Sequence, residues 1–200
     1  FSFEGLENGL YDLSFLEDGT LLSTFQVIVG AEVNPNENKY ADPICSASLD
    51  AESGFNAVIW EKENIEFIAS YDVYRESSVT SQFEWIGNVH VDSLSMFIDT
   101  EFDAGTSSTR YNLTAVDSCG TSIDDFGAHR TMHLQSSLGV NGEVNLFWNA
   151  YEGVGYSNFS IHRSTDGINY FEIATVANNV YAFTDQFPPS GNKWYQIRIP

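Results

Sequence analysis

The sequence predicts an all-β protein built from two tandem β-sandwiches, and three observations support this. Strand-favouring residues dominate the composition, with 14% aromatic, 42% hydrophobic and only 18% charged residues. The stretch Arg110–Gly120 alternates with a period of two, which puts one face of a strand on a core; the inward positions are Tyr111, Leu113 and Ala115. Side chains at strand positions in the middle of the chain also recur 84 to 88 residues later.

Composition also limits the function. The apolar content suffices for compact cores, so we reject disorder, and no apolar run approaches the roughly 20 residues of a membrane helix. The net charge of −20 disfavours nucleic-acid binding, because such a surface repels phosphates. Two explanations of this charge remain: solubility in a salty or extracellular setting, and binding of divalent cations. Since the chain begins with Phe1, we interpret it as a mature or excised piece.

Residues 1–30 predict a β-hairpin segment. Strands are expected at Phe1–Phe3, Leu10–Phe15 and Leu21–Val29, with a turn at Glu17-Asp18-Gly19. An isolated hairpin is marginal in water. We therefore interpret this segment as the tail of a preceding β-domain, or as a hairpin that packs on the next part of the chain.

Residues 31–43 predict a linker, because polar residues and two prolines replace the strand pattern. A plain spacer is one interpretation. The other is an interdomain Ca²⁺ site with Glu32, Glu37 and Asp42 as ligands, although their spacing is not that of an EF-hand. Ca²⁺ is the one cofactor that the sequence leaves open.

Residues 44–129 predict the first sandwich, called module 1. Seven short strands separated by turn signals are typical of this architecture. They are expected at Ile44–Leu49, Ala57–Glu61, Ser70–Arg75, Phe83–Val89, Met96–Thr100, Tyr111–Asp117 and Gly127–Leu134.

Residues 130–200 predict a second copy, called module 2. The matching positions are Trp60 with Trp148, and Tyr71, Val73 and Arg75 with Phe159, Ile161 and Arg163. Farther along, Asp99 matches Asp185, and Tyr111 matches Tyr195. We predict two separate cores whose members are Trp60, Tyr71, Val73, Tyr111, Leu113, Trp148, Phe159, Ile161, Tyr195 and Ile197.

The residues of these strands resemble a known family. Tyr-x-Leu-x-Ala-Val-Asp-x-x-Gly from Tyr111, Val-Ile-Trp-Glu-Lys around Trp60 and Tyr-Asp-Val-Tyr-Arg-Glu from Tyr71 are similar to tandem fibronectin type III modules. Such pairs occur in secreted, multidomain cell-surface proteins of Bacteroidota, many of which use type IX secretion. The resemblance covers about residues 44–200. It implies immunoglobulin-like sandwiches, an extracellular or cell-surface location, and a tyrosine corner in which the Tyr111 hydroxyl bonds nearby backbone.

The resemblance implies two further features. Module 2 stops straight after the strand of Tyr195, so its seventh strand is missing; either the fragment ends arbitrarily, or a neighbouring subunit donates the strand. In the family's strand order, Cys45 and Cys119 lie at one pole of module 1. We therefore expect a structural disulfide between them, with a buried free thiol pair as the alternative.

Enzyme motifs are missing from the sequence. It contains no Gly-x-Ser-x-Gly, no phosphate loop and no His-Glu-x-x-His. We expect the pairs Asp124-Asp125 and Glu101/Asp103 to be solvated, and Asp99 and Asp185 to cap turns. The histidines are expected at the surface without shared metal ligation: His90, His129, His133 and His162. No catalytic, cofactor-binding or metal-ligating residue is predicted.

The sequence contains two kinds of candidate carbohydrate site, for sugar stacking and for glycosylation. Four tyrosines in or near loops of module 2 are candidates for stacking on sugars, against the alternative of partial burial: Tyr151, Tyr156, Tyr170 and Tyr181. Asn112 and Asn158 open N-glycosylation triplets, and Asp92-Ser93-Leu94 fits a short O-glycosylation pattern of Bacteroidota.

The predicted function is that of a non-enzymatic structural or adhesion segment of a large extracellular cell-surface protein, acting as a spacer or interaction module. Its expected partners are neighbouring β-modules of the same polypeptide, with surface glycans or other subunits as further candidates; nucleic acid and membrane insertion are not expected. Two alternatives stay open. One is an accessory, glycan-binding module of a secreted enzyme, and the other is a filament subunit joined by strand donation.

Overall fold

The computed structural model describes residues 9–17, 20–29, 44–50, 52–62 and 68–200. Within these ranges the regular structure is entirely β, in antiparallel sheets. The chain divides into two compact units, Phe1–Ala41 and Asp42–Pro200. The predicted strand Phe1–Phe3 and the candidate Ca²⁺ ligands Glu32, Glu37 and Asp42 lie outside the described residues.

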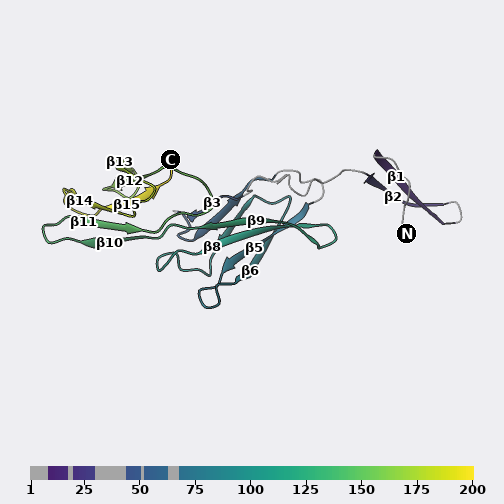
Figure 1. Cartoon of the computed structure of the whole chain (residues 1–200), viewed down its shortest axis with the longest axis horizontal. Helices are drawn as coiled ribbons and strands as arrows, with labels where there is room; N and C mark the ends of the chain where they lie inside the picture. Colours follow the sequence, from purple (N-terminus) through teal and green to yellow (C-terminus); the bar gives the residue numbers. More distant parts are fainter. Residues whose placement is uncertain (1–8, 18–19, 30–43, 51, 63–67) are drawn as a thin grey trace. The chain divides into compact units, whose positions relative to one another are not determined.

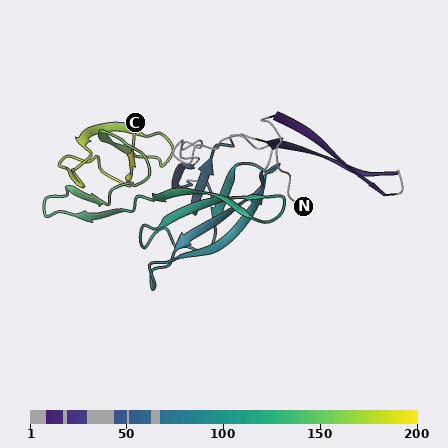
Figure 2. The same ribbon diagram turned by 45° about the vertical axis from the view of Figure 1, so that its right-hand side comes forward.

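The first unit contains a β-hairpin. Strand β1 (Gly9–Glu17) pairs antiparallel with β2 (Thr20–Val29), from Gly9 opposite Val29 to Glu17 opposite Thr20. The register shifts between Phe15 and Leu16, where the apolar alternation of the sequence also breaks. Figures 1 and 2 show the two strands as a long ribbon, and they form a two-stranded sheet.

Module 1 is a β-sandwich of two sheets (Figure 1). One sheet has the order β3-β4-β7 and the other the order β6-β5-β8-β9. This three-plus-four arrangement is fibronectin type III-like, with strands switching sheets along the chain. The strands are β3 (Ile44–Leu49), β4 (Asn56–Trp60), β5 (Ile68–Glu76), β6 (Phe83–His90), β7 (Met96–Asp99), β8 (Arg110–Asp117) and β9 (Ser122–Arg130).

Module 2 repeats this order with one strand fewer. Its sheets are β10-β11-β14 and β13-β12-β15. Each strand corresponds to its counterpart in module 1, except that β15 has no neighbour equivalent to β9 among the described strands. The strands are β10 (Leu134–Leu138), β11 (Val144–Trp148), β12 (Asn158–Ser164), β13 (Phe171–Ala177), β14 (Ala182–Asp185) and β15 (Trp194–Arg198).

The two cores are built alike. Trp60 packs on Tyr71 with ring centroids 5.5 Å apart, and Trp148 packs on Phe159 at 5.7 Å. These four side chains and Val73, Tyr111, Leu113 and Ile161 are all buried. Tyr195 and Ile197 are half-buried on β15, which is an edge strand among the described strands of module 2. The matching surroundings of the two tryptophans identify a duplicated sandwich.

Most strands of module 1 lie within two residues of their predicted bounds, but the seventh differs more. The seventh strand of module 1 was expected at Gly127–Leu134, but β9 spans Ser122–Arg130 and Leu134 opens β10. The chain reverses directly after β8, because Gly120 adopts a φ of +79° and the Asp117 carbonyl accepts the Gly120 amide. The next strand therefore begins within two residues of the turn.

Candidate functional site

The loop between β11 and β12 of module 2 contacts module 1 through Tyr151. The Tyr151 hydroxyl accepts a hydrogen bond from the Ala47 amide of β3 at 3.0 Å. The same oxygen lies 2.9 Å from Nδ1 of His129 on β9, and the two rings meet edge to face. His129 is fully buried, and Tyr151 is only 8% exposed. One phenol thus ties module 2 to both sheets of module 1.

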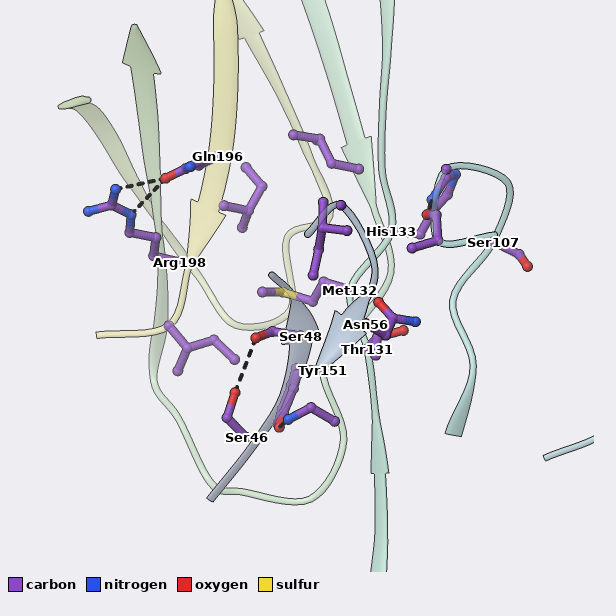
Figure 3. A pocket seen from close by; sticks show the side chains of 18 of the residues that line it. Ser46, Ser48, Asn56, Ser107, Thr131, Met132, His133, Tyr151, Gln196 and Arg198 are labelled. Carbon is purple, nitrogen blue, oxygen red and sulfur yellow. Dashed lines mark hydrogen bonds between the residues drawn. The ribbon is translucent and has the colours of Figure 1, made fainter. Parts of the chain in front are cut away.

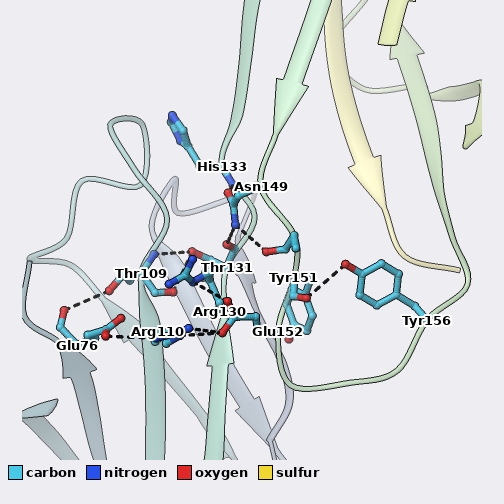
Figure 4. A network of polar contacts seen from close by, with 11 residues as sticks. Glu76, Thr109, Arg110, Arg130, Thr131, His133, Asn149, Tyr151, Glu152 and Tyr156 are labelled. Carbon is cyan, nitrogen blue, oxygen red and sulfur yellow. Dashed lines mark hydrogen bonds and ion pairs between the residues drawn. The ribbon is translucent and has the colours of Figure 1, made fainter. Parts of the chain in front are cut away.

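Glu152 adds an ionic contact beside this tyrosine (Figure 4). Its carboxylate lies 2.7 Å from Nη2 of Arg110 and 3.2 Å from Nε of Arg130. The hydrogen bond from Arg110 to Glu152 raises the pKa of that guanidinium. The backbone of Glu152 also forms a β-bridge with Arg130, in which the Arg130 amide donates at 3.0 Å. The loop is therefore fixed by a main-chain contact as well as by the ion pairs of the Glu152 side chain.

The connector between the modules, residues 131–133 between β9 and β10, is hydrogen-bonded to both modules. Asn149 of module 2 donates to the Thr131 carbonyl at 2.9 Å and accepts the His133 amide at 2.7 Å. Thr131 in turn exchanges hydrogen bonds with Thr109 of module 1. Thr131 is buried, so these bonds are shielded from water. We name Tyr151, Glu152 and Asn149, with the groups that they contact, the junction clamp.

The clamp depends on a glycine. Gly153 has a φ of +120°, and a Cβ built on it would lie 2.3 Å from Cγ of His129. A side chain is therefore excluded both by the backbone conformation and by the packing of His129. Gly155, two residues on, has no atom within 4 Å of the equivalent position.

A groove of about 880 Å³ lies beside the clamp (Figure 3). Its walls come from β3 of module 1, from the connector around Met132 and His133, and from residues Tyr195 to Ile199 of module 2. Strand β15 pairs with β12 and has no second neighbour among the described strands, and residues Tyr195 to Ile199 line this groove. The groove therefore lies at an edge strand and has a mixed polar and apolar surface.

The repeated Arg, Asp and Tyr positions meet inside each module. Arg75 lies 2.8 Å from the buried Asp99, to which the Tyr111 hydroxyl donates at 2.7 Å. In module 2, Arg163 lies 2.6 Å from Asp185, and Tyr195 donates to the same carboxylate at 2.8 Å. The aspartates were predicted to cap turns; Asp99 accepts the Glu101 amide, but both act mainly as ion-pair partners.

The predicted tyrosine corner is therefore wrong in detail. The Tyr111 hydroxyl bonds the Asp99 carboxylate and accepts from Nδ2 of Asn56, rather than bonding nearby backbone. A buried carboxylate next to an arginine is a stronger acceptor than a carbonyl.

The predicted disulfide is absent from the structure, in which Cys45 and Cys119 are both exposed and are not joined. The strand order does bring them to the same end of module 1. Cys45 lies at a register shift of β3 in one sheet, whereas Cys119 lies in the turn after β8 in the other. The Asp117 carboxylate accepts the Cys119 amide and fixes that turn.

The histidine and tyrosine predictions are corrected at the clamp. His129 was expected at the surface but is fully buried. Tyr151 was a candidate for stacking on sugars, with partial burial as the alternative; it is buried and packs on His129. No sequence signal links these two residues, since they come from different modules. Of the other candidate tyrosines, Tyr156 and Tyr170 are half-buried and Tyr181 is 42% exposed.

The remaining polar candidates do not assemble into a site. Asp103 accepts the Gly105 amide within its own turn, Glu101 is exposed, and the side chains of Asp124 and Asp125 are not among those described. Among the described residues, no three His, Cys, Asp or Glu side chains gather as metal ligands would. Of the glycosylation candidates, Asn158 and Ser93 are exposed and Asn112 is half-buried on β8.

Over the described residues there is no helix of the length and apolarity needed to cross a bilayer.

Known proteins offer only distant likenesses to this chain. No family model and no curated protein match the chain. Among solved structures it is similar to the FN1–FN3 domains of chicken CNTN1, with 10% identity, a TM-score of 0.32, and coverage of 76% of this chain and 54% of that one. It is also similar to the chicken interferon gamma receptor alpha chain, with 11% identity, the same TM-score, and coverage of 76% and 87%. The chain thus spans about half the length of the first of these. Neither likeness is close enough to add to the strand order as an argument for the fold.

Proposed function

We propose that this chain is a non-enzymatic spacer or adhesion segment of an extracellular cell-surface protein, and that its two modules act as one rigid body. The observation that supports rigidity is the junction clamp. Flexible linkers leave tandem domains free to move unless their interface is well packed. Here a buried tyrosine, a carboxylate shared by two arginines and a backbone bridge join the modules through a single loop.

A rigid junction suits a spacer, because a fixed angle between modules transmits position and force over the length of the segment. The acidic surface supports an extracellular setting, since a net charge of −20 keeps such a segment soluble and apart from polyanions. The resemblance to secreted modules supports the same setting.

Distance measurements between spin labels test the rigidity. Labels are placed at Val79→Cys in module 1 and Val140→Cys in module 2, which are 90% and 100% exposed, in a Cys45→Ser/Cys119→Ser background. We expect one narrow distance distribution for the full chain. Tyr151→Ala/Glu152→Ala should broaden it, because the clamp is lost.

A matched control is Tyr170→Ala/Glu172→Ala, which removes the same residue types from module 2 away from the junction. It should leave the distribution unchanged. A broad distribution in the parent chain, or equal broadening in both double variants, would show that the clamp does not set the angle.

A second candidate function is acceptance of a strand from a neighbouring subunit. It is favoured by the position of β15 at the edge of its sheet among the described strands and by the half-buried Ile197. Its counterpart Leu113 lies on β8, which pairs with β9, and is fully buried. An added strand would pair with β15 and cover the Ile197 side chain.

Light scattering over a range of protein concentrations tests this candidate. Strand acceptance predicts oligomers that Ile197→Lys abolishes, because the charge would be buried under the added strand. Ile168→Lys, at a position that is 81% exposed, is the control and should not change assembly. A parent chain that stays monomeric into the millimolar range rules out self-donation.

A further inference from the structure

The outer face of the four-stranded sheet of module 1 carries an exposed tryptophan in a fixed orientation. Trp85 on β6 is 58% exposed, although tryptophan is mostly buried in folded proteins. Its indole nitrogen donates to Oδ1 of Asp72 on β5 at 2.9 Å. This hydrogen bond favours one orientation of the ring on the sheet.

The aspartate belongs to a larger polar network on the same face. Oδ1 of Asp72 also accepts from Nδ2 of Asn88 at 2.9 Å, and the same amide lies 2.9 Å from Oγ of Ser70. Asn88 and Trp85 both come from β6, the edge strand of the sheet, so the network is open to solvent. A carboxylate, an amide and a hydroxyl, those of Asp72, Asn88 and Ser70, are thus hydrogen-bonded to one another near the ring.

The strand register extends this arrangement across the sheet. Tyr74 pairs with Trp85 on one side and with Asn112 on the other, while Asp72 pairs with Asn88 and with Thr114. Cross-strand partners point to the same face. The outer face therefore has an aromatic pair, Trp85 on β6 and Tyr74 on β5, next to a polar row that runs over β6, β5 and β8, and we name it the Trp85 platform.

We propose that the Trp85 platform binds a neutral polysaccharide. A pyranose ring presents an apolar face of C–H groups, which stacks on an aromatic ring, and hydroxyls at its rim, which exchange hydrogen bonds with amides and carboxylates. The platform offers both features side by side. The net charge of −20 repels polyanionic sugars, so we assign the platform to a neutral rather than an acidic polymer. This proposal does not depend on the junction clamp, which involves other residues.

Binding to insoluble and gel-embedded polysaccharides tests the proposal. The full chain is assayed against cellulose, chitin, xylan, mannan and β-1,3-glucan, with heparin as an anionic comparison. We expect retention on at least one neutral polymer, and Trp85→Ala should weaken it at least tenfold. Asp72→Ala should weaken it too, since the indole loses its hydrogen-bond acceptor.

Trp194→Ala is the matched control, because Trp194 is 40% exposed but lies on β15 of module 2. It should bind as the parent does, and melting curves should show all three variants folded. No retention on any neutral polymer, binding to heparin alone, or equal losses in Trp85→Ala and Trp194→Ala would each overturn the proposal. Spin-label distances in Trp85→Ala should stay narrow, which separates this test from that of the junction clamp.

Discussion

Tyr111 donates a hydrogen bond to Oδ2 of Asp99 over 2.7 Å, in the interior of module 1, and the tyrosine is fully buried. The same relationship occurs between Tyr195 and Asp185 in module 2, where the tyrosine is only half-buried. Each aspartate is also paired with an arginine from the neighbouring sheet. This network therefore joins the two sheets of each sandwich, and its exposure to water differs between the copies.

Removing the tyrosine hydroxyl should lower the free energy of unfolding more in module 1 than in module 2. Tyr111→Phe leaves both Asp99 and the Asn56 amide short of a partner in a dry interior, for an expected loss of about 2–3 kcal/mol in the free energy of unfolding. Tyr195→Phe should lower it by about 1 kcal/mol, because Tyr195 is only half-buried and its hydroxyl is less shielded from water. Urea denaturation of the two variants measures both values. Equal losses would contradict the role assigned to burial.

The buried tyrosine also predicts a loss of stability at alkaline pH. Burial raises the pKa of Tyr111 above its ordinary value, with the negative Asp99 contributing. The stabilisation is therefore complete below about pH 10, where unfolded tyrosine is protonated, and falls as the pH rises further. The urea midpoint of the parent chain should drop more steeply between about pH 10 and 12 than that of Tyr111→Phe. Parallel pH profiles would argue against this linkage.

Gly153 should be intolerant of the smallest side chain. Gly153→Ala places a Cβ against the His129 ring at a φ of +120°, so the loop must move and the clamp must loosen. We expect a loss on the order of 1–3 kcal/mol in unfolding free energy. Gly155→Ala, which meets no atom within 4 Å, should change stability by less than about 0.5 kcal/mol. Thermal and urea unfolding of the pair distinguish a packing requirement from a general need for loop flexibility.

The sequence was informative where structure is periodic. The alternation of Tyr111 and Leu113 predicted both the strand and its inward face, because a period of two is a local property of β-structure. The recurrence of Arg75, Asp99 and Tyr111 in module 2 marked these positions, yet it did not reveal that their side chains meet. That contact depends on how the two sheets pack on each other, which spacing along the chain does not encode.

The junction clamp could not be predicted from the sequence for the same reason. His129 and Tyr151 are each unremarkable in sequence, and their burial follows only from the docking of a loop of one module on the other. The end of the seventh strand was misplaced because apolar residues continue through the connector to Leu134, so hydrophobicity alone gave no boundary. The groove beside β15 likewise depends on the relative placement of two sheets.

The two cysteines should be reactive thiols. Both are exposed and not joined in the structure, so alkylation under native, non-reducing conditions should modify each of them. Partial burial raises the pKa of the Cys45 thiol, with the nearby Glu61 adding to the effect, so its thiolate fraction is reduced near neutral pH. Cys45 should therefore react faster in urea than in the folded chain, and its folded-state rate should keep rising with pH beyond about 9. Peptide mass spectrometry resolves the two sites. A chain about 2 Da lighter than its reduced form, and unreactive until a reductant is added, would contradict this prediction, because it would show that Cys45 and Cys119 form a disulfide.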